Sequence, residues 1–422
     1  MKRGKATATA EPAALTRGGL RRVLAVLCVT EIVSWGVLYY AFPVLAPTIA
    51  ADTGWPMATT TAAFSTGLVV SALVGIWSGR LLDRIGPRPV MTAGSVLAVP
   101  AVLGIATAPS LPVFFSGWAL AGVAMAATLY PPAFAALTRW WGHRRLRALT
   151  ALTLLAGLAS TIFAPLTATL LGHLGWRHTY LALAVVLAVV TIPAHLLGLH
   201  GRWPDPDPAK DRPGAANDQA PDAIARSRPF LLLTAAVGLG AFTAFAVVVN
   251  QVPLLLERGA STSLAAWALG LGGLGQVLGR LGYGRLTQRL SVRSRGVVVL
   301  GLSAAATALL AVLPGPTPLL IAVAMLAGAA RGVFTLLQAT AISDRWGAVH
   351  YGRLNGLLSA PALIATALAP WAGAALAQTL GGYPAVFAVL AGLAALGAVL
   401  AVGSTPGRNG GGLTGTRMLS KN

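Results

Sequence analysis

The sequence predicts an all-α membrane protein with twelve transmembrane helices in two pseudo-symmetric six-helix bundles. Three observations lead to this fold class: a very apolar composition, apolar runs of membrane-spanning length, and one long polar stretch that divides these runs six and six. Of the 422 residues, 56% are hydrophobic and only 10% are charged. A water-soluble globule of this size cannot bury so much apolar surface. Lipid must therefore be the solvent for much of the chain.

Each apolar run is close to the roughly 20 residues that a helix needs to cross the hydrocarbon core. The first run follows Arg21 and Arg22, is too long for the core of a signal peptide and has no clear cleavage site, so we expect it to stay as a membrane helix. In chain order the predicted helices are 23–46, 59–80, 90–108, 113–138, 148–171, 179–200, 230–256, 264–285, 297–313, 318–342, 354–379 and 383–403.

The long polar stretch is 201–228, which includes the run Trp203-Pro204-Asp205-Pro206-Asp207-Pro208. Such a composition cannot bury apolar area and is typical of a solvated linker. The predicted organisation is therefore a cytoplasmic N-terminal tail (1–22), an N-terminal bundle (23–200), a cytoplasmic linker (201–228), a C-terminal bundle (229–403) and a cytoplasmic C-terminal tail (404–422).

The net charge of +20 could indicate a nucleic-acid partner, because basic surfaces bind phosphates. The basic residues instead form short clusters between apolar runs, which is the positive-inside pattern. With both termini in the cytoplasm, 28 of the 31 Lys and Arg lie on the cytoplasmic side, and only Arg177 and Arg258 lie outside. We therefore expect a multi-pass protein of the plasma (inner) membrane, monomeric in the lipid bilayer and without a nucleic-acid partner.

The sequence has no arrangement of residues that is typical of a catalytic site or of a metal site. Cys28 is the single cysteine, and the six histidines are not spaced as metal ligands. The stretch 270–275 is rich in glycine but follows no predicted strand and lacks a Gly-Lys-Ser/Thr ending, so it indicates a close-packed helix and not a nucleotide loop. We expect no metal, no cofactor and no enzymatic activity, since no nucleophile, base and orienting group share one depth.

Glu31 and Arg331 are the acid and the strong base that lie well inside predicted helices. Each costs about 2.5–3.5 kcal/mol or more to insert unless it is paired or hydrated. Both lie within a turn or two of the middle of a core about 30 Å thick. Arg331 could attract an anionic substrate, and Glu31 could pair with it or titrate. A structural buried pair or a snorkelling arginine is the alternative.

Other polar residues on predicted helices are weaker candidates for substrate binding. They could hydrogen-bond a ligand, or they could join helices to one another. Arg280 could act in the same way, or it could be one more cytoplasmic arginine that sets the topology. The candidates, besides Glu31, Arg280 and Arg331, are Tyr39, Asn250, Gln251, Gln276 and Gln338.

The motif Gly79-x-x-x-Asp83-Arg84-x-Gly86-x-Arg88 resembles the signature loop of the major facilitator superfamily. In that superfamily this loop contributes to the gate that closes the cytoplasmic side. A second copy about two hundred residues later keeps Gly284, Arg285, Arg289 and Arg293 but has Gln288 in place of Asp83. The resemblance implies a cytoplasmic gate made by Gly79, Asp83, Arg84, Gly86, Arg88, Arg285 and Arg289.

A finer resemblance is to the monocarboxylate and oxalate–formate branch of the superfamily. It begins at Arg139-Trp140-Trp141-Gly142-His143-Arg144-Arg145, continues to Gly172-His173-Leu174-Gly175-Trp176-Arg177, and includes Gln276-x-x-x-Arg280. In that branch an acidic residue stands at the position of Gln276, and the arginine engages the carboxylate substrate. Helices 1, 4, 7 and 10 line the cavity in the superfamily, which implies that Glu31 and Arg331 face it.

These observations together predict a secondary transporter that moves a small organic anion, in particular a carboxylate, by alternating access. A gradient of protons or of substrate would drive it, because no phosphate loop is present. One alternative is an efflux carrier for hydrophobic or cationic drugs, with Glu31 as the recognition residue. A second is a transporter-like membrane sensor that moves no solute.

Overall fold

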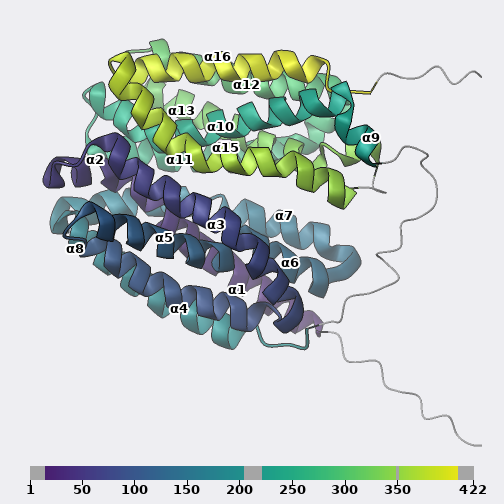
Figure 1. Cartoon of the computed structure of the whole chain (residues 1–422), viewed down its shortest axis with the longest axis horizontal. Helices are drawn as coiled ribbons and strands as arrows, with labels where there is room; N and C mark the ends of the chain where they lie inside the picture. The colour runs from purple at the N-terminus through teal and green to yellow at the C-terminus, as the bar shows by residue number, and fades with distance from the viewer. Residues whose placement is uncertain (1–14, 204–220, 348–350, 407–422) are drawn as a thin grey trace, which may run out of the picture.

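A computed structural model describes residues 15–203, 221–347 and 351–406. In that part of the chain, long helices form two bundles that lie side by side (Figure 1). The first bundle comprises α1 (Arg17–Trp35), η1 (Gly36–Tyr40), α2 (Ala41–Thr53), α3 (Met57–Ile85), α4 (Pro87–Ala106), α5 (Leu111–Thr128), α6 (Tyr130–Trp141), η2 (Gly142–Arg144), α7 (Arg145–Ala156) and α8 (Ala159–Gly198). The predicted all-helical, two-bundle fold is confirmed.

The second bundle follows the linker. Most of the linker predicted at 201–228 lies outside the described residues, and its end forms the short helix α9 (Pro221–Arg226). The predicted tails also lie largely outside them, although α1 already begins at Arg17. The helices of this bundle are α10 (Arg228–Glu257), α11 (Thr262–Arg289), α12 (Val292–Val312), α13 (Thr317–Thr340), α14 (Ser343–Trp346), α15 (Tyr351–Leu380) and α16 (Tyr383–Val402).

Ten segments in the described residues are long and apolar enough to cross a membrane. The number is lower than twelve for two physical reasons. Two predicted helices, 148–171 and 179–200, are merged into one span, Arg147–Gly198, in which α8 is interrupted at Gly175, where φ is 72° and ψ is 168°. The helix α11 is long enough to cross, but its glycines and its polar residues Gln276 and Arg280 make it less apolar. With α8 divided and α11 included, the twelve predicted helices are present.

Several membrane helices are broken where the sequence carries proline or glycine. Leu129 is extended between α5 and α6, and Pro131 and Pro132 lie in the first turn of α6, where the missing N–H costs no helical hydrogen bond. Between α1 and α2 the chain widens into the π-helical turn η1. There a Cβ on Gly36 would overlap the Phe163 ring of α8, so glycine is what lets these helices pack.

The two bundles share a hydrophobic core at only one end. The largest cluster of buried apolar side chains joins residues of α2 and η1 to residues of α10 and α11, with Tyr39, Leu45 and Ile49 on one side and Val252 and Leu269 on the other. At the end where α1 begins and α16 ends, each bundle has its own cluster. The bundles are therefore held together at the end that contains the common cluster, which we call the shared end. At the opposite end, where α1 begins and α16 ends, the bundles have separate cores, and we call this the terminal end.

Hydrogen bonds between helices also connect the bundles. The backbone N–H of Trp371 on α15 donates to the Ser65 hydroxyl on α3 over 3.2 Å. The hydroxyl of Thr161 on α8 donates to the Gly270 carbonyl on α11 over 2.8 Å. The contacts leave a central space between α1, α6, α10, α11 and α13, in which the candidate site lies.

Candidate functional site

A cavity lies between the two bundles and is lined by both of them. The first bundle contributes mainly aromatic side chains to its wall, and the second contributes its cationic and amide groups. The lining residues are Trp35, Tyr39, Tyr40, Tyr130, Ala156, Phe245, Val248, Gln276, Arg280, Arg331 and Thr335.

Arg331 enters the cavity from α13 and is held by Gln276 of α11. Its Nε and Nη2 atoms donate to the same side-chain oxygen of Gln276, over 3.0 and 2.6 Å, and only 8% of Arg331 is exposed. Arginine has five N–H donors, and an amide oxygen is neutral. The positive charge of Arg331 is thus oriented by Gln276 but not compensated by it.

The contact between these two residues depends on glycine. A Cβ on Gly332 of α13 would overlap the Gln276 carbonyl, and a Cβ on Gly328 would overlap the Gly272 carbonyl. With hydrogen in place of a side chain, α11 and α13 pack backbone to backbone, as small residues allow in membrane helices. This close approach, predicted for the glycine-rich stretch 270–275, brings Gln276 within reach of Arg331.

Arg280 supplies the second positive charge, one turn of α11 beyond Gln276. It is 8% exposed, and its Nη1 donates to the backbone carbonyl of Thr153 on α7. Its Nε is buried and has no hydrogen-bond partner among the described residues. Arg280 is therefore part of the cavity wall.

An aromatic wall faces these two arginines. The rings of Trp35 and Tyr130 are 5.1 Å apart, those of Trp35 and Tyr39 are 5.3 Å apart, and those of Tyr39 and Tyr40 are 5.2 Å apart. Tyr39 also contacts Phe245 of the second bundle, at 6.2 Å between centroids. Such rings offer apolar surface to the body of a ligand and hydroxyl or indole groups to its polar end.

Glu31 lies on α1 behind this wall. It is fully buried, and neither of its carboxyl oxygens has a hydrogen-bond partner among the described residues. Arg331 is bound to Gln276 instead, so the pair of Glu31 and Arg331 is not formed in this structure. Glu31 is not among the residues that line the cavity, whereas Trp35, one helical turn further on, lines it.

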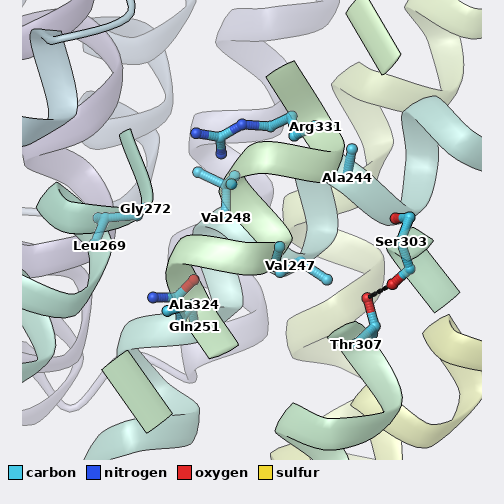
Figure 2. Close-up of a pocket in the computed structure, with 12 residues that line it drawn as sticks. Ala244, Val247, Val248, Gln251, Leu269, Gly272, Ser303, Thr307, Ala324 and Arg331 are labelled. Carbon is cyan, nitrogen blue, oxygen red and sulfur yellow. Dashed lines mark hydrogen bonds between the residues drawn. The ribbon is translucent and has the colours of Figure 1, made fainter. Parts of the chain in front are cut away.

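A second cavity lies within the C-terminal bundle, next to the first, and Arg331 lines both of them. Figure 2 shows it from within the bundle, with the Arg331 guanidinium and the Gln251 amide pointing away from Ser303 and Thr307. The hydroxyl of Thr307 is bonded to the Ser303 carbonyl at 2.8 Å. The Nε2 atom of Gln251 is buried and unpartnered among the described residues, so this amide is an additional donor near Arg331.

Two predicted binding residues lie away from both cavities. Asn250 is fully buried and donates to the Ala246 carbonyl of its own helix over 2.8 Å, and a Cβ on Gly373 would overlap its amide. This packing favours a helix-joining role. Gln338 is half-buried on α13, two turns beyond Arg331, and lines neither cavity.

The predicted gate residues lie at the terminal end of α3 and α4. The Asp83 carboxylate is 3.5 Å from Arg139, which lies in the last turn of α6 in the same bundle. Trp203, where the linker begins, donates its indole N–H to the Asp83 carbonyl over 3.1 Å. The Arg139 guanidinium lies over the Trp203 ring, 4.6 Å from its centroid. The start of the linker is thus fixed on Asp83 and Arg139.

The other predicted gate residues have different surroundings. Gly86 has a φ of 84°, which an L side chain rarely adopts, and turns the chain from α3 into α4 beneath Trp203. Arg88 donates to the Leu196 carbonyl over 2.8 Å. Gly79, Arg84, Arg285 and Arg289 are exposed, and a Cβ on Gly79 would contact nothing within 4 Å.

The second bundle has its own ionic contact at the equivalent level. Arg295, at the start of α12, is 3.0 Å from Asp344 of α14. The next residue, Arg345, donates to the carbonyl and hydroxyl of Ser404 over 2.8 and 3.1 Å. Burial lowers the pKa of the Arg345 guanidinium to about 10. The second loop copy has Gln288 where the first has Asp83, and the acid of this ionic contact comes instead from α14.

Sequence reasoning missed several residues of the cavity wall. Trp35, Tyr130, Phe245 and Thr335 line it, but on their own they look like ordinary apolar or helix-joining positions. One signal was present: Glu31, Trp35 and Tyr39 are spaced by four, so they follow one face of a helix. Tyr130 could not be found this way, because it comes from the break before α6.

These features define the class of protein. Helices of membrane-spanning length in two bundles, with a cavity between them that two arginines line, describe a multi-pass membrane protein.

The chain belongs to the Major Facilitator Superfamily, whose sequence model matches residues 27–316 and 240–417. The resemblance to the superfamily is confirmed, and so is the embedding in a membrane.

Relatives of two kinds are found. The chain is 29% identical to monocarboxylate transporter 13 of Bos taurus over 60% of this chain and 56% of that protein. It is 30% identical to monocarboxylate transporter 11 of Homo sapiens over 67% of this chain and 59% of that one. It is also 30% identical to the multidrug resistance protein MdtL of Shigella flexneri over 53% and 57%. Each match spans less than two thirds of the relative.

Among solved structures, the chain resembles a bacterial homologue of the human lysosomal transporter Spinster, described as inward-facing and unoccupied. The TM-score is 0.69 with 16% identity, over 92% of this chain and 95% of that one. At this identity the likeness shows the fold alone. The resemblance to the monocarboxylate branch is confirmed by the sequence relatives, while the drug-resistance relatives show that similarity alone does not fix the substrate.

Proposed function

We propose that this chain is a secondary transporter that carries a small organic anion, in particular a carboxylate, by alternating access between its two bundles. The observation that supports this most directly is the convergence of Arg280 and Arg331 on one cavity. Both are buried, and their side-chain partners are a neutral amide and a peptide carbonyl. Two uncompensated positive charges at the centre of a membrane protein favour an anionic ligand.

The aromatic wall supports a monocarboxylate with an apolar or planar body. The carboxylate would bind the arginines of the second bundle, while Trp35, Tyr39 and Tyr130 would pack against the body of the ligand. Each bundle would thus bind a different end of the same molecule. The ligand would then join the bundles, which is what a substrate must do in a rocking mechanism.

The gate would close at the terminal end. Ser65 lies opposite Trp371 across α3 and α15, and the two helices run in opposite directions. Eighteen residues further along α3 and eighteen earlier on α15, Asp83 falls opposite Arg353. In this structure Asp83 binds Arg139, and Arg353 binds Asp222 at 2.6 Å. On closure, Asp83 would pair with Arg353 in place of Arg139. Arg285 and Arg289 would lie at the edge of the second bundle that faces Asp83.

We further propose that this terminal end faces the cytoplasm and that the protein resides, as a monomer, in the plasma (inner) membrane. The excess of basic residues at this end supports the orientation. The chain would then consist of bundles at 23–200 and 229–403 joined by a cytoplasmic linker at 201–228. A gradient of protons or of substrate would drive transport.

A second candidate function is drug efflux, which the similarity to MdtL favours. In that case the aromatic wall would bind a hydrophobic or cationic compound, Glu31 would be the recognition residue, and Arg331 would have a structural role. The two functions differ in the sign of the charge that the cavity must accept.

Substitution of Arg331 by Gln distinguishes them. In proteoliposomes loaded with pyruvate, lactate or phenylacetate, we expect counterflow of the labelled anion to be lost in Arg331→Gln. We expect it to persist in Arg293→Gln, which removes the same charge from an exposed position. Anion counterflow that survives Arg331→Gln would contradict the anion assignment, and drug export that survives it would support the efflux candidate.

A further inference from the structure

A third cavity lies between the two bundles at the shared end, and we call it the shared-end cavity. Its volume is about 340 Å³, which is enough for a small organic molecule. Residues in the last two turns of α2, α10 and α15 and at the starts of α3 and α16 line it. These lining residues are Pro47, Ala50, Met57, Pro253, Leu256, Glu257, Ala374, Ala377, Gln378 and Tyr383.

The wall of this cavity contains an acid that is not paired with a cation. Glu257 is the last residue of α10 and is exposed, and its Oε2 atom accepts the backbone N–H of Tyr383 over 2.9 Å. Arg258 interacts with Glu257 electrostatically, but its guanidinium donates to the Ala311 carbonyl of α12 over 2.8 Å and lies outside the cavity wall. A carboxylate accepts about four hydrogen bonds, so Glu257 retains capacity for another donor.

The turn between α15 and α16 holds this carboxylate in place. Gly381 and Gly382 have φ angles of 79° and 135°, and a Cβ on Gly382 would lie 3.2 Å from Oε2 of Glu257. Glu257 can therefore approach the start of α16, where the first N–H groups have no partner within the helix. That contact occupies Oε2 and leaves the charge of the carboxylate uncompensated.

The hydroxyl of Tyr383 is a second polar group that needs a partner. Tyr383 is only 7% exposed, and its hydroxyl makes no hydrogen bond to any residue that the structure describes. A buried hydroxyl in this state is unfavourable until a ligand or water completes it. Gln378 of α15 adds an exposed amide to the same wall. A carboxylate, a hydroxyl and an amide can all accept hydrogen bonds.

The rest of the wall is apolar and comes from both bundles. Proline, alanine, methionine and leucine side chains surround the three polar groups, as in most small-molecule sites. The charge of this cavity is opposite to that of the central cavity, where Arg280 and Arg331 lie. A ligand that fits the shared-end cavity is thus a cation with an apolar body.

We propose that the shared-end cavity is a second binding site, which takes a primary ammonium ion with an apolar body. The ammonium group has three N–H donors and would bind the Glu257 carboxylate, the Tyr383 hydroxyl and the Gln378 carbonyl. The apolar body would lie against the apolar side chains of both bundles. This binding does not depend on the proposed transport of an anion.

Occupation of this site would affect the movement of the bundles. A molecule there contacts both bundles at the end where their common core holds them together. It would stabilise the closed shared end and oppose the separation that alternating access requires at that end. We therefore expect the ammonium ligand to inhibit transport without competing with the anion. This consequence, unlike the binding itself, rests on the proposed function.

Binding of radiolabelled phenethylamine to the purified full-length chain at pH 7 tests the site. We expect saturable binding, and much weaker competition by 2-phenylethanol, which has the same body without the charge. In Glu257→Gln the amide oxygen can still accept the Tyr383 N–H, but binding should be about 10-fold weaker or more, because a charge-assisted hydrogen bond is lost. Asp52→Asn is the matched control and should bind normally, since Asp52 is an exposed acid of α2 that accepts from Trp176 and does not line the cavity.

A second variant, Ala50→Leu, covers the case in which Glu257→Gln does not fold. The larger side chain would fill the cavity from the first bundle without touching the charge of Glu257, so phenethylamine binding should again fall about 10-fold or more. Undiminished binding in a folded Glu257→Gln or Ala50→Leu protein would overturn the proposal, and so would equal binding of 2-phenylethanol. Loss of binding in Arg331→Gln would place the amine in the central cavity and would also overturn it, as would the absence of saturable binding to the unaltered chain.

Counterflow of a labelled anion in liposomes tests the consequence for transport. Phenethylamine should lower the maximal rate in the unaltered chain, leave the anion concentration at half-maximal rate unchanged, and have little effect in Glu257→Gln. Competition between phenethylamine and the anion, or binding without inhibition, would overturn the inhibitory role. An unaltered chain that binds phenethylamine but exchanges no anion would contradict the proposed function and leave this second site intact.

Discussion

Replacement of Gln276 by Glu would change the charge of the cavity without changing its shape. The amide oxygen of Gln276 already accepts two N–H groups of Arg331 at 2.6 and 3.0 Å. A carboxylate of the same length could accept both of them and would add a full negative charge. The formal charge from Arg280 and Arg331 would fall from two to one, and Arg331 would be compensated before any substrate arrives.

The size of the effect follows from Coulomb's law. A substrate carboxylate bound to Arg331 from the cavity would lie roughly 6 Å from the new charge. At an effective dielectric constant of about 20 the repulsion is about 3 kcal/mol, which corresponds to about 100-fold weaker binding. The thermal stability of the protein should not fall, since Arg331 gains a charged partner in place of a neutral one.

The assay is the affinity for pyruvate, lactate or phenylacetate measured by thermal shift on the purified protein, together with counterflow in liposomes. The control is Gln276→Met, which has similar volume and no acceptor. Its anion binding should persist, while its stability should drop because Arg331 loses two hydrogen bonds. If Gln276→Glu bound the anion as tightly as the unaltered chain, Arg331 would not be the anion-binding residue.

Two further predictions concern the gate and the helix packing. Asp83→Asn should impair counterflow because the terminal end could no longer exchange ionic partners, whereas Gln288→Asn, at the matching place in the second bundle, should change it little; equal effects of the two would contradict an asymmetric gate. Gly332→Ala should destabilise the protein by about 1–3 kcal/mol, because the added methyl group would displace the Gln276 backbone. Gly301→Ala, where a Cβ would meet nothing within 4 Å, should be harmless in the same thermal unfolding experiment.

The sequence was sufficient to predict the architecture of this protein. Apolar runs, the polar linker and the proline and glycine breaks each depend on local composition, and the two helices merged in α8 still separate at Gly175, between their predicted bounds. The buried positions of Glu31 and Arg331 could also be predicted, because the cost of a charge in lipid depends only on depth.

The partners of these residues could not be predicted. Arg331 binds Gln276, which is 55 residues away in the chain, and that contact exists because Gly328 and Gly332 let α13 approach α11. Tyr130 reaches the cavity because the chain is extended at Leu129. Both contacts depend on the relative placement of helices, which local patterns do not contain.

Each bundle has one ionic contact at the terminal end, but the order of its two residues along the chain is reversed between the bundles. The acid comes first in the first bundle, and the arginine comes first in the second. In the first bundle Asp83 lies in the last turn of α3 and Arg139 in the last turn of α6. In the second bundle Arg295 lies in the first turn of α12 and Asp344 in α14, which follows α13. The side chain of Asp83 is 65% exposed and that of Asp344 only 27%. The two halves are therefore not interchangeable parts. A protein assembled from two copies of the first half would have two exposed acids, each equivalent to Asp83, facing each other at the terminal end. Electrostatic repulsion between them would oppose closure of that end.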